Sequence, residues 1–211
     1  MADKIATSLV RIALDADRGS LRHPRALAIC TRAALFADLA FAGCLVDGGR
    51  SPQITGAAPT GDRILDTLRA AVGNQPGHLW RRWFTYVRVD REAVCRELVE
   101  SGMWTVEHDR RALVLSGRRY RDQQADSALI LVGRTLEVTE YRRAPDDGRE
   151  AVLAALSVIC GSITGRPRPR TMETELLRLL DVIGTLQDPT RRAVQASLDS
   201  AATAVRRGRS R

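Results

Sequence analysis

Residues 26–42 constrain the fold more than any other segment, because this stretch is apolar on nearly every side of a helix. Pro24 stands at the expected first helical position, and Gly43 supplies a stop. The only charges within the segment are Arg32 and Asp38, whose spacing puts them on different faces of a helix. A helix that is apolar all round is buried on all sides. The segment therefore predicts a central helix with other helices packed around it.

The rest of the chain predicts shorter elements around that helix. Aromatic residues make up only 4% of the chain, so Leu, Val, Ile and Ala must fill the core, which favours packed helices. We predict a mainly α fold, a single helical domain with a central apolar helix bundle, surrounding amphipathic helices and short β-hairpins. The expected elements are a mixed segment at 4–14, a strand–turn–strand unit at 44–55, a helix capped by 60–62, helices within 78–101, a hairpin at 104–115, and helices at 125–138 and 150–163.

The C-terminal part is predicted to follow a linker. Residues 166–170 alternate arginine and proline, a pattern that blocks helix and stays solvated. The linker separates the core region 1–165 from a helical pair at 171–205, and residues 206–211 are predicted to be a frayed basic tail. All of these parts belong to one domain over residues 1–211.

Membrane spans and disulfides are not expected. The longest uncharged run, residues 151–165, is too short and too rich in small residues to cross a bilayer, and no apolar leader follows Met1. The four cysteines lie far apart without a CxxC pair, as is typical of reduced thiols in a cytosolic protein.

The charge balance indicates an anionic partner. The formal net charge is +8, and Lys4 is the only lysine among the basic residues. A surplus of this size favours binding to a polyanion, either nucleic acid or an anionic membrane surface.

Catalytic and metal-binding motifs do not occur in the sequence. It contains no nucleophile elbow, no phosphate-binding glycine loop and no zinc-protease motif. His23, His78 and His108 fall in separate segments without ligand spacing to any cysteine. We therefore expect a protein that is not an enzyme and that holds no metal or cofactor.

Three arginines form a candidate phosphate site. Arg88 and Arg91 lie three apart on one predicted helix and so share a face. Arg32 is a charge inside an apolar helix, where it requires an anion or a deep hydrogen-bond network. The planar guanidinium fork suits a phosphate because it forms two parallel bonds. The alternative is that Arg88 and Arg91 are solvated surface and that Arg32 pairs with an acidic residue.

Three segments carry a resemblance to a known family: Ala-Pro-Thr-Gly-Asp at 58–62, Leu-Val-Glu-Ser-Gly-Met-Trp at 98–104, and Arg-Ala-Ala-Leu-Phe-Ala-Asp-Leu-Ala-Phe-Ala-Gly-Cys-Leu at 32–45. Together they resemble the Golgi phosphoprotein 3 family, over most of residues 14–163. The resemblance implies a mostly helical fold and recognition of phosphoinositide headgroups on membranes.

The resemblance also implies site residues. In eukaryotic members a tryptophan and three arginines bind phosphatidylinositol 4-phosphate. Through the surrounding motifs the arginine positions fall on Arg32, Arg88 and Arg91, whereas the tryptophan position falls near His23 and the tryptophan is not kept. A histidine buries less apolar area than an interfacial tryptophan, so insertion into the bilayer is less expected than headgroup binding.

Two further segments bear on the membrane and on self-association. Residues 80–84 combine aromatic and basic side chains. Trp80 and Trp83 fit either an amphipathic membrane contact or a core stripe, with the core favoured for at least one of them. The resemblance implies a projecting hairpin that mediates homo-oligomers, at the position of residues 138–148, where a plain surface loop is the alternative.

Our leading hypothesis is a cytoplasmic, non-enzymatic module that binds anionic phospholipid membranes peripherally, foremost phosphatidylinositol 4-phosphate or a related phosphoinositide. One alternative is a winged-helix-like nucleic-acid binder that uses helix 88–101 and hairpin 104–115, with phosphate contacts from Arg110, Arg111, Arg118 and Arg119. Three acidic residues within 92–100 argue against base contact there. Another alternative is a scaffold that acts through protein partners alone.

Overall fold

A computed structural model of the chain describes residues 4–56, 58–86, 91–108, 118–162, 179, 181, 183, 186 and 188–209. The elements in chain order are α1 (Ile5–Ile12), β1 (Leu14–Asp15), β2 (Ser20–Leu21), α2 (Pro24–Phe41), β3 (Leu45–Asp47), β4 (Pro52–Ile54), α3 (Arg63–Gly73), α4 (Trp80–Tyr86), α5 (Arg91–Glu100), β5 (Trp104–His108), β6 (Arg118–Asp122), α6 (Ala125–Thr139), α7 (Gly148–Cys160) and α9 (Asp188–Arg209). The described strands form three antiparallel two-stranded hairpins. The mainly α fold class is confirmed.

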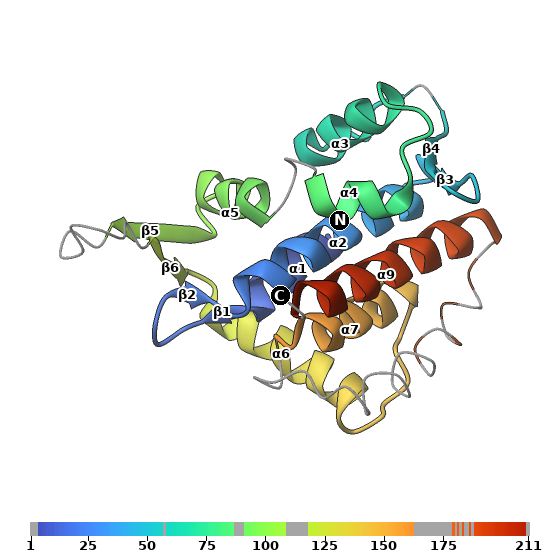
Figure 1. The fold of residues 1–211 in the computed structure, drawn as a ribbon. Coiled ribbons are helices and arrows are strands. Elements are labelled where there is room, and N and C mark those ends of the chain that lie inside the picture. Colours follow the sequence, from blue (N-terminus) through green and yellow to red (C-terminus); the bar gives the residue numbers. More distant parts are fainter. Residues whose placement is uncertain are drawn as a thin grey trace.

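The predicted central helix is α2. Every side chain from Ala33 to Ala40 is buried, and α1, α7 and α9 pack against this helix (Figure 1). Alanines occupy much of the buried stretch, and their small side chains let neighbouring helix backbones approach closely. Pro24 begins the helix and Gly43, at φ 70°, follows its end, both as predicted.

Helix α1 corrects the expectation of a mixed segment at 4–14. Its first amide groups are capped from a distant part of the chain: Ile5 N donates to Asp38 Oδ1 at 3.1 Å and Ala6 N donates to Asp38 Oδ2 at 3.2 Å. Lys4 precedes the helix and joins Asp62 and Glu97, each at 2.6 Å. Asp38, the second charged residue of the central helix α2, therefore caps the N-terminus of α1.

The aromatic–basic run lies in α4, and its apolar rings belong to the core. Trp80, Trp83 and Phe84 are buried, and the Phe36 ring lies 5.3 Å from that of Trp80. The predicted core packing of the tryptophans is confirmed. Upstream, Asp62 caps α3 by accepting from Ile64 N and Leu65 N at 2.9 Å, as the turn at 60–62 predicted.

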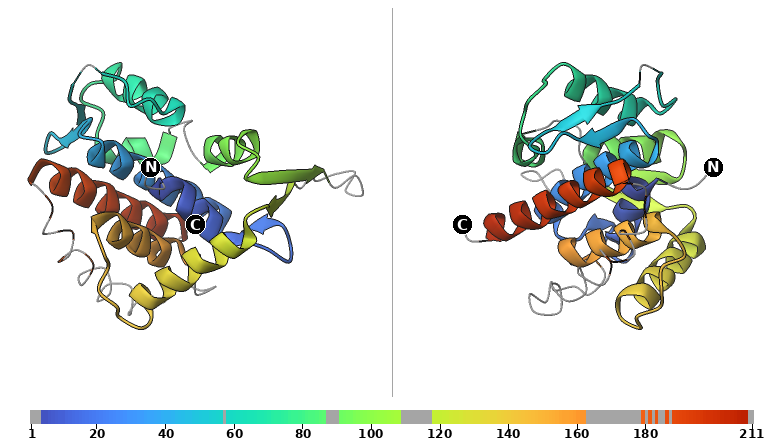
Figure 2. Two further views of the ribbon diagram at one scale, coloured as in Figure 1. Left: turned by 180° about the vertical axis from the view of Figure 1, so that it is seen from behind. Right: turned by 90° about the vertical axis from the view of Figure 1, so that its right-hand side faces the viewer.

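The hairpin β5–β6 extends from the body of the molecule in Figures 1 and 2. A hairpin was predicted here with its second strand near 112–115, which lie outside the described residues. The strand that pairs with β5 is β6, with Trp104 opposite Asp122. The register is held at its base, because Arg11 and Trp104 both donate to Asp122.

Residues 138–148 form the end of α6 and its connection to α7, with no strand in this described segment. The segment therefore forms a surface loop rather than the expected projecting hairpin. Arg143 ties the loop down by pairing with Asp146 at 2.7 Å and with Glu150 at 2.6 Å. Tyr141 lies on the loop with 81% of its surface exposed.

Helix α9 confirms the last predicted helix and corrects its end. It continues to Arg209, so most of the predicted tail at 206–211 is helical. The linker at 166–170 and most of the first C-terminal helix lie outside the described residues. Within the described ranges, no helix is both long enough and apolar enough to pass through a bilayer.

The four cysteines form no disulfide in the structure; Cys30, Cys95 and Cys160 are buried and Cys44 is partly exposed.

Candidate anion-binding cleft

A cleft of about 750 Å³ lies where α2, α4 and α9 meet. This volume falls in the range of small-molecule sites, roughly 300–1,000 Å³. Its polar lining residues are Arg25, Arg32, Arg81, Asp199, Ser200, Thr203 and Arg207. Ala28, Ile29, Phe84 and Ala204 supply the apolar part of the wall.

The α2 wall follows from helical spacing. Arg25, Ile29 and Arg32 stand four and three residues apart, which places them on one face of the helix. This face starts near the helix N-terminus, where the helix dipole also favours anions. Arg32 is half-buried, and its Nη1 donates to the Phe84 carbonyl at 2.7 Å, which fixes the guanidinium against α4.

The α9 wall has the same periodicity. Asp199, Thr203 and Arg207 recur every fourth residue, and Ser200 lies beside them. Helix α9 packs alongside α2 and α4 (Figures 1 and 2). Its C-terminal turns therefore bring hydroxyl groups and an arginine opposite the arginines of α2.

The cleft is strongly cationic. Four guanidinium groups face one carboxylate, that of Asp199. Arg25, Arg81 and Arg207 are exposed at its rim, whereas Arg32 lies deeper. The Asp199 side chain keeps a solvent-exposed face, yet partial desolvation raises its pKa. An anion that enters the cleft meets several arginine donors from three separate elements.

The predicted site residues are partly brought together. Arg32 lines the cleft, and Arg91 Nη1 donates to the Pro24 carbonyl at 2.7 Å, next to Arg25. His23 precedes α2 in a left-handed conformation, at φ 46°, and does not line the cleft. Arg88 lies outside the described residues.

The arginines at the rim of the cleft were not predicted from the sequence. Arg25, Arg81 and Arg207 were not assigned to a site, although the spacing of seven between Arg25 and Arg32 could have indicated a shared face. Nothing local links Arg207 to them, because it arrives through the packing of α9. Replacement of Arg32 or Arg91 would also disturb the packing of the helices, since each side chain donates to a backbone carbonyl of another element.

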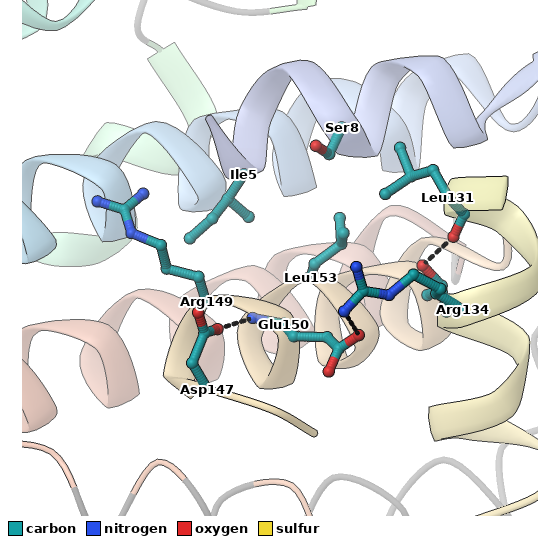
Figure 3. A pocket seen from close by; sticks show the side chains of 9 residues that line it. Ile5, Ser8, Leu131, Arg134, Asp147, Arg149, Glu150 and Leu153 are labelled. Carbon is teal, nitrogen blue, oxygen red and sulfur yellow. Dashed lines mark hydrogen bonds and ion pairs between the residues drawn. The ribbon is translucent and has the colours of Figure 1, made fainter. Parts of the chain in front are cut away.

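A second hollow, of about 250 Å³, lies between α1, α6 and α7 (Figure 3). Its charged groups are satisfied within the protein: Arg134 lies 3.4 Å from Glu150, and Asp147 accepts from Glu150 N at 2.8 Å. Arg149 reaches Asp38 at 3.1 Å. These pairs make the hollow a structural seam rather than a ligand site. In the described part of the chain, no three metal-ligating side chains are grouped to hold an ion.

A family model described as Golgi phosphoprotein 3 (GPP34) matches residues 5–201. Among curated proteins no match to the chain is found.

Proposed function

We propose, from the premise that this chain belongs to the Golgi phosphoprotein 3 (GPP34) family, that it is a non-enzymatic module that binds anionic lipid headgroups at a membrane surface. Phosphatidylinositol 4-phosphate or a related phosphoinositide is the foremost ligand, and the cytoplasmic face of a membrane is the proposed location. The observation that carries the proposal is the arginine-lined cleft between α2, α4 and α9.

Charge and chemistry both support such a ligand. A phosphomonoester carries about −1.5 to −2 charges at neutral pH, and the cleft has a surplus of guanidinium groups. Arginines arriving from three elements surround an anion better than a flat basic surface does, because each fork can take two oxygens. The apolar wall at Ile29 and Phe84 can accept the nonpolar part of a headgroup.

The mode of attachment should be electrostatic. Trp80, Trp83 and Trp104 are all buried, so the three tryptophans of the chain do not supply an interfacial anchor. His23 stands near the position where the family resemblance implies a tryptophan. Attachment without insertion weakens with salt, because surface attraction is screened over about 8–10 Å at physiological ionic strength.

The double variant Arg25→Ala/Arg207→Ala should weaken sedimentation with phosphoinositide-containing vesicles by up to about 30-fold at low salt. Each arginine near an anionic surface contributes about 1 kcal/mol. In the described structure neither side chain forms a hydrogen bond or ion pair within the protein, so the fold should be retained. The matched control is Arg18→Ala/Arg121→Ala, which removes the same charge from the hairpins and should bind nearly as well as the unaltered protein.

A DNA mobility-shift assay at the same salt concentration distinguishes the lipid proposal from the nucleic-acid alternative. Equal vesicle binding by the double variant and the unaltered protein would remove the cleft from the site. A shift of DNA without vesicle binding would favour the nucleic-acid alternative over the lipid proposal. Arg32→Ala is a less decisive variant, because it also removes the bond to the Phe84 carbonyl.

Self-association through residues 138–148 stays a prediction. Tyr141 is 81% exposed, and the neighbouring α6 exposes Leu129 and Ile130. If this surface joins two copies, Tyr141→Asp should lower the solution mass measured by light scattering, because a carboxylate would be buried in the contact. Gln195→Glu on the exposed side of α9 is the charge-matched control. An oligomer that keeps its mass in Tyr141→Asp would exclude this segment as its interface.

A further inference from the structure

One carboxylate stands in an otherwise cationic cleft. Asp199 is the only acidic side chain among the described residues that line it, and it faces the same space as Arg25 and Arg32. For a site that binds nothing but negative charge, this carboxylate is unfavourable, because it repels every phosphate that enters.

The fold itself does not require Asp199. The residue lies in the middle of α9 (Asp188–Arg209), too far from either end to cap the helix, and aspartate is a weaker helix former than alanine. Within the described structure its carboxylate takes part in no hydrogen bond or ion pair, although arginines line the same cleft. A function in the cleft would account for the residue better than a structural role does.

The neighbours of Asp199 can bind hydroxyl groups. Ser200 and Thr203 also line the cleft, and each hydroxyl can both donate and accept. A carboxylate accepts strongly from a ligand hydroxyl, because a hydrogen bond to a charged acceptor is about twice as strong as a neutral one.

The size of the cleft fits a ligand larger than a phosphate group. At about 30 Å³ for each water in the liquid, a phosphate of a few water volumes would occupy a small part of about 750 Å³. The remaining space is lined by the α9 hydroxyls and the apolar wall.

We infer that Asp199, with Ser200 and Thr203, is the specificity element of the cleft: it favours an anionic headgroup with free hydroxyls, a phosphorylated polyol, over anions of equal charge without them. The arginines supply the attraction, and the carboxylate rejects anions that offer no hydroxyl donor in return. This inference rests on the proposed function, because both concern the same cleft.

The test compares two vesicle compositions with equal surface charge, phosphatidylcholine with phosphatidylinositol 4-phosphate and phosphatidylcholine with phosphatidic acid. The unaltered protein should prefer the phosphoinositide vesicles. Asp199→Ala should bind phosphatidic acid vesicles more tightly and phosphoinositide vesicles more weakly, so that the preference falls about ten-fold. That is the loss expected for one hydrogen bond to a charged group. Alanine favours helix, so α9 should remain folded.

Asp126→Ala is the matched control, because it removes an exposed aspartate from α6, outside the cleft. It should change binding to both vesicle types by the same small factor. Equal shifts for both lipids in Asp199→Ala, or an unaltered protein without any preference, would overturn the inference and leave the proposed function standing. An unaltered protein that binds neither vesicle would instead overturn the proposed function.

Discussion

Asp122→Ala is expected to lower the free energy of unfolding by about 3–5 kcal/mol, the usual cost of removing one partner from a buried ion pair. Asp122 and Arg11 have side chains only 6% and 5% exposed and meet at 2.9 Å. The same carboxylate accepts from Trp104 Nε1 at 3.0 Å and from Gln124 N at 2.8 Å. The variant therefore leaves a buried guanidinium and an indole N–H without their acceptor.

Urea denaturation followed by circular dichroism measures this cost. Arg121→Ala, one residue away and exposed, should change stability by less than about 0.5 kcal/mol. Burial alone would raise the pKa of Asp122, but hydrogen bonds from Arg11, Gln124 and Trp104 outweigh it and lower the pKa. A lowered pKa stabilises the fold above the unfolded value, about 3.9, and this contribution is lost as pH falls through the folded value. The gap between the two proteins should therefore shrink in strong acid, and a gap that widened there would contradict this assignment.

Asp38→Ala is expected to lower the free energy of unfolding by about 2–5 kcal/mol, because three hydrogen-bond donors lose their acceptor. These are Ile5 N, Ala6 N and the Arg149 guanidinium, which also lies over the Phe41 ring at 4.8 Å. The damage should concentrate at the start of α1, where hydrogen exchange would report faster opening. Unchanged exchange in α1 would contradict the capping role.

The pH dependence at Asp38 has the opposite sign from that at Asp122. Burial raises the pKa of Asp38 to about 6, and the Ala6 and Ile5 amides and Arg149 only partly offset it. A raised folded pKa favours the fold at low pH, and this contribution is lost as pH rises through about 6. Relative to Asp38→Asn, which does not titrate, the unaltered protein should lose roughly 2–3 kcal/mol of stability between pH ~4 and ~7. A difference that stayed constant over this range would exclude titration of Asp38.

Local signals made much of the fold predictable. The α2 boundaries follow from Pro24 and Gly43, and the α3 start follows from Asp62, because each signal acts on its own neighbours. Helix α1 was missed because its cap, Asp38, is supplied from another helix. The second strand of hairpin β5–β6 was predicted too early in the chain for a similar reason. Its register depends on the bond between Asp122 and Arg11, and Arg11 lies outside the hairpin.

The site was less predictable than the fold. Arg32 stood out as a charge in an apolar helix, and the resemblance pointed to the same position. The α9 residues of the cleft gave no signal, because Asp199 and Arg207 acquire their neighbours only when the last helix packs on α2 and α4. The predicted frayed tail at 206–211 contained one of them, Arg207.

Helix α9 forms one wall of the cleft. Docking of this helix on the core is therefore thermodynamically coupled to ligand binding in the cleft. One face of α9, from Ala193 to Val205, is buried against the core, whereas Asp199, Thr203 and Arg207 line the cleft. A ligand held between α2 and α9 binds only the docked arrangement, so it adds to docking stability in proportion to the logarithm of its concentration over its dissociation constant. Under the proposed function, a partner that bound the released helix would by reciprocity compete with the ligand of the cleft. Docking of the C-terminal helix and ligand binding would then share one coupling free energy.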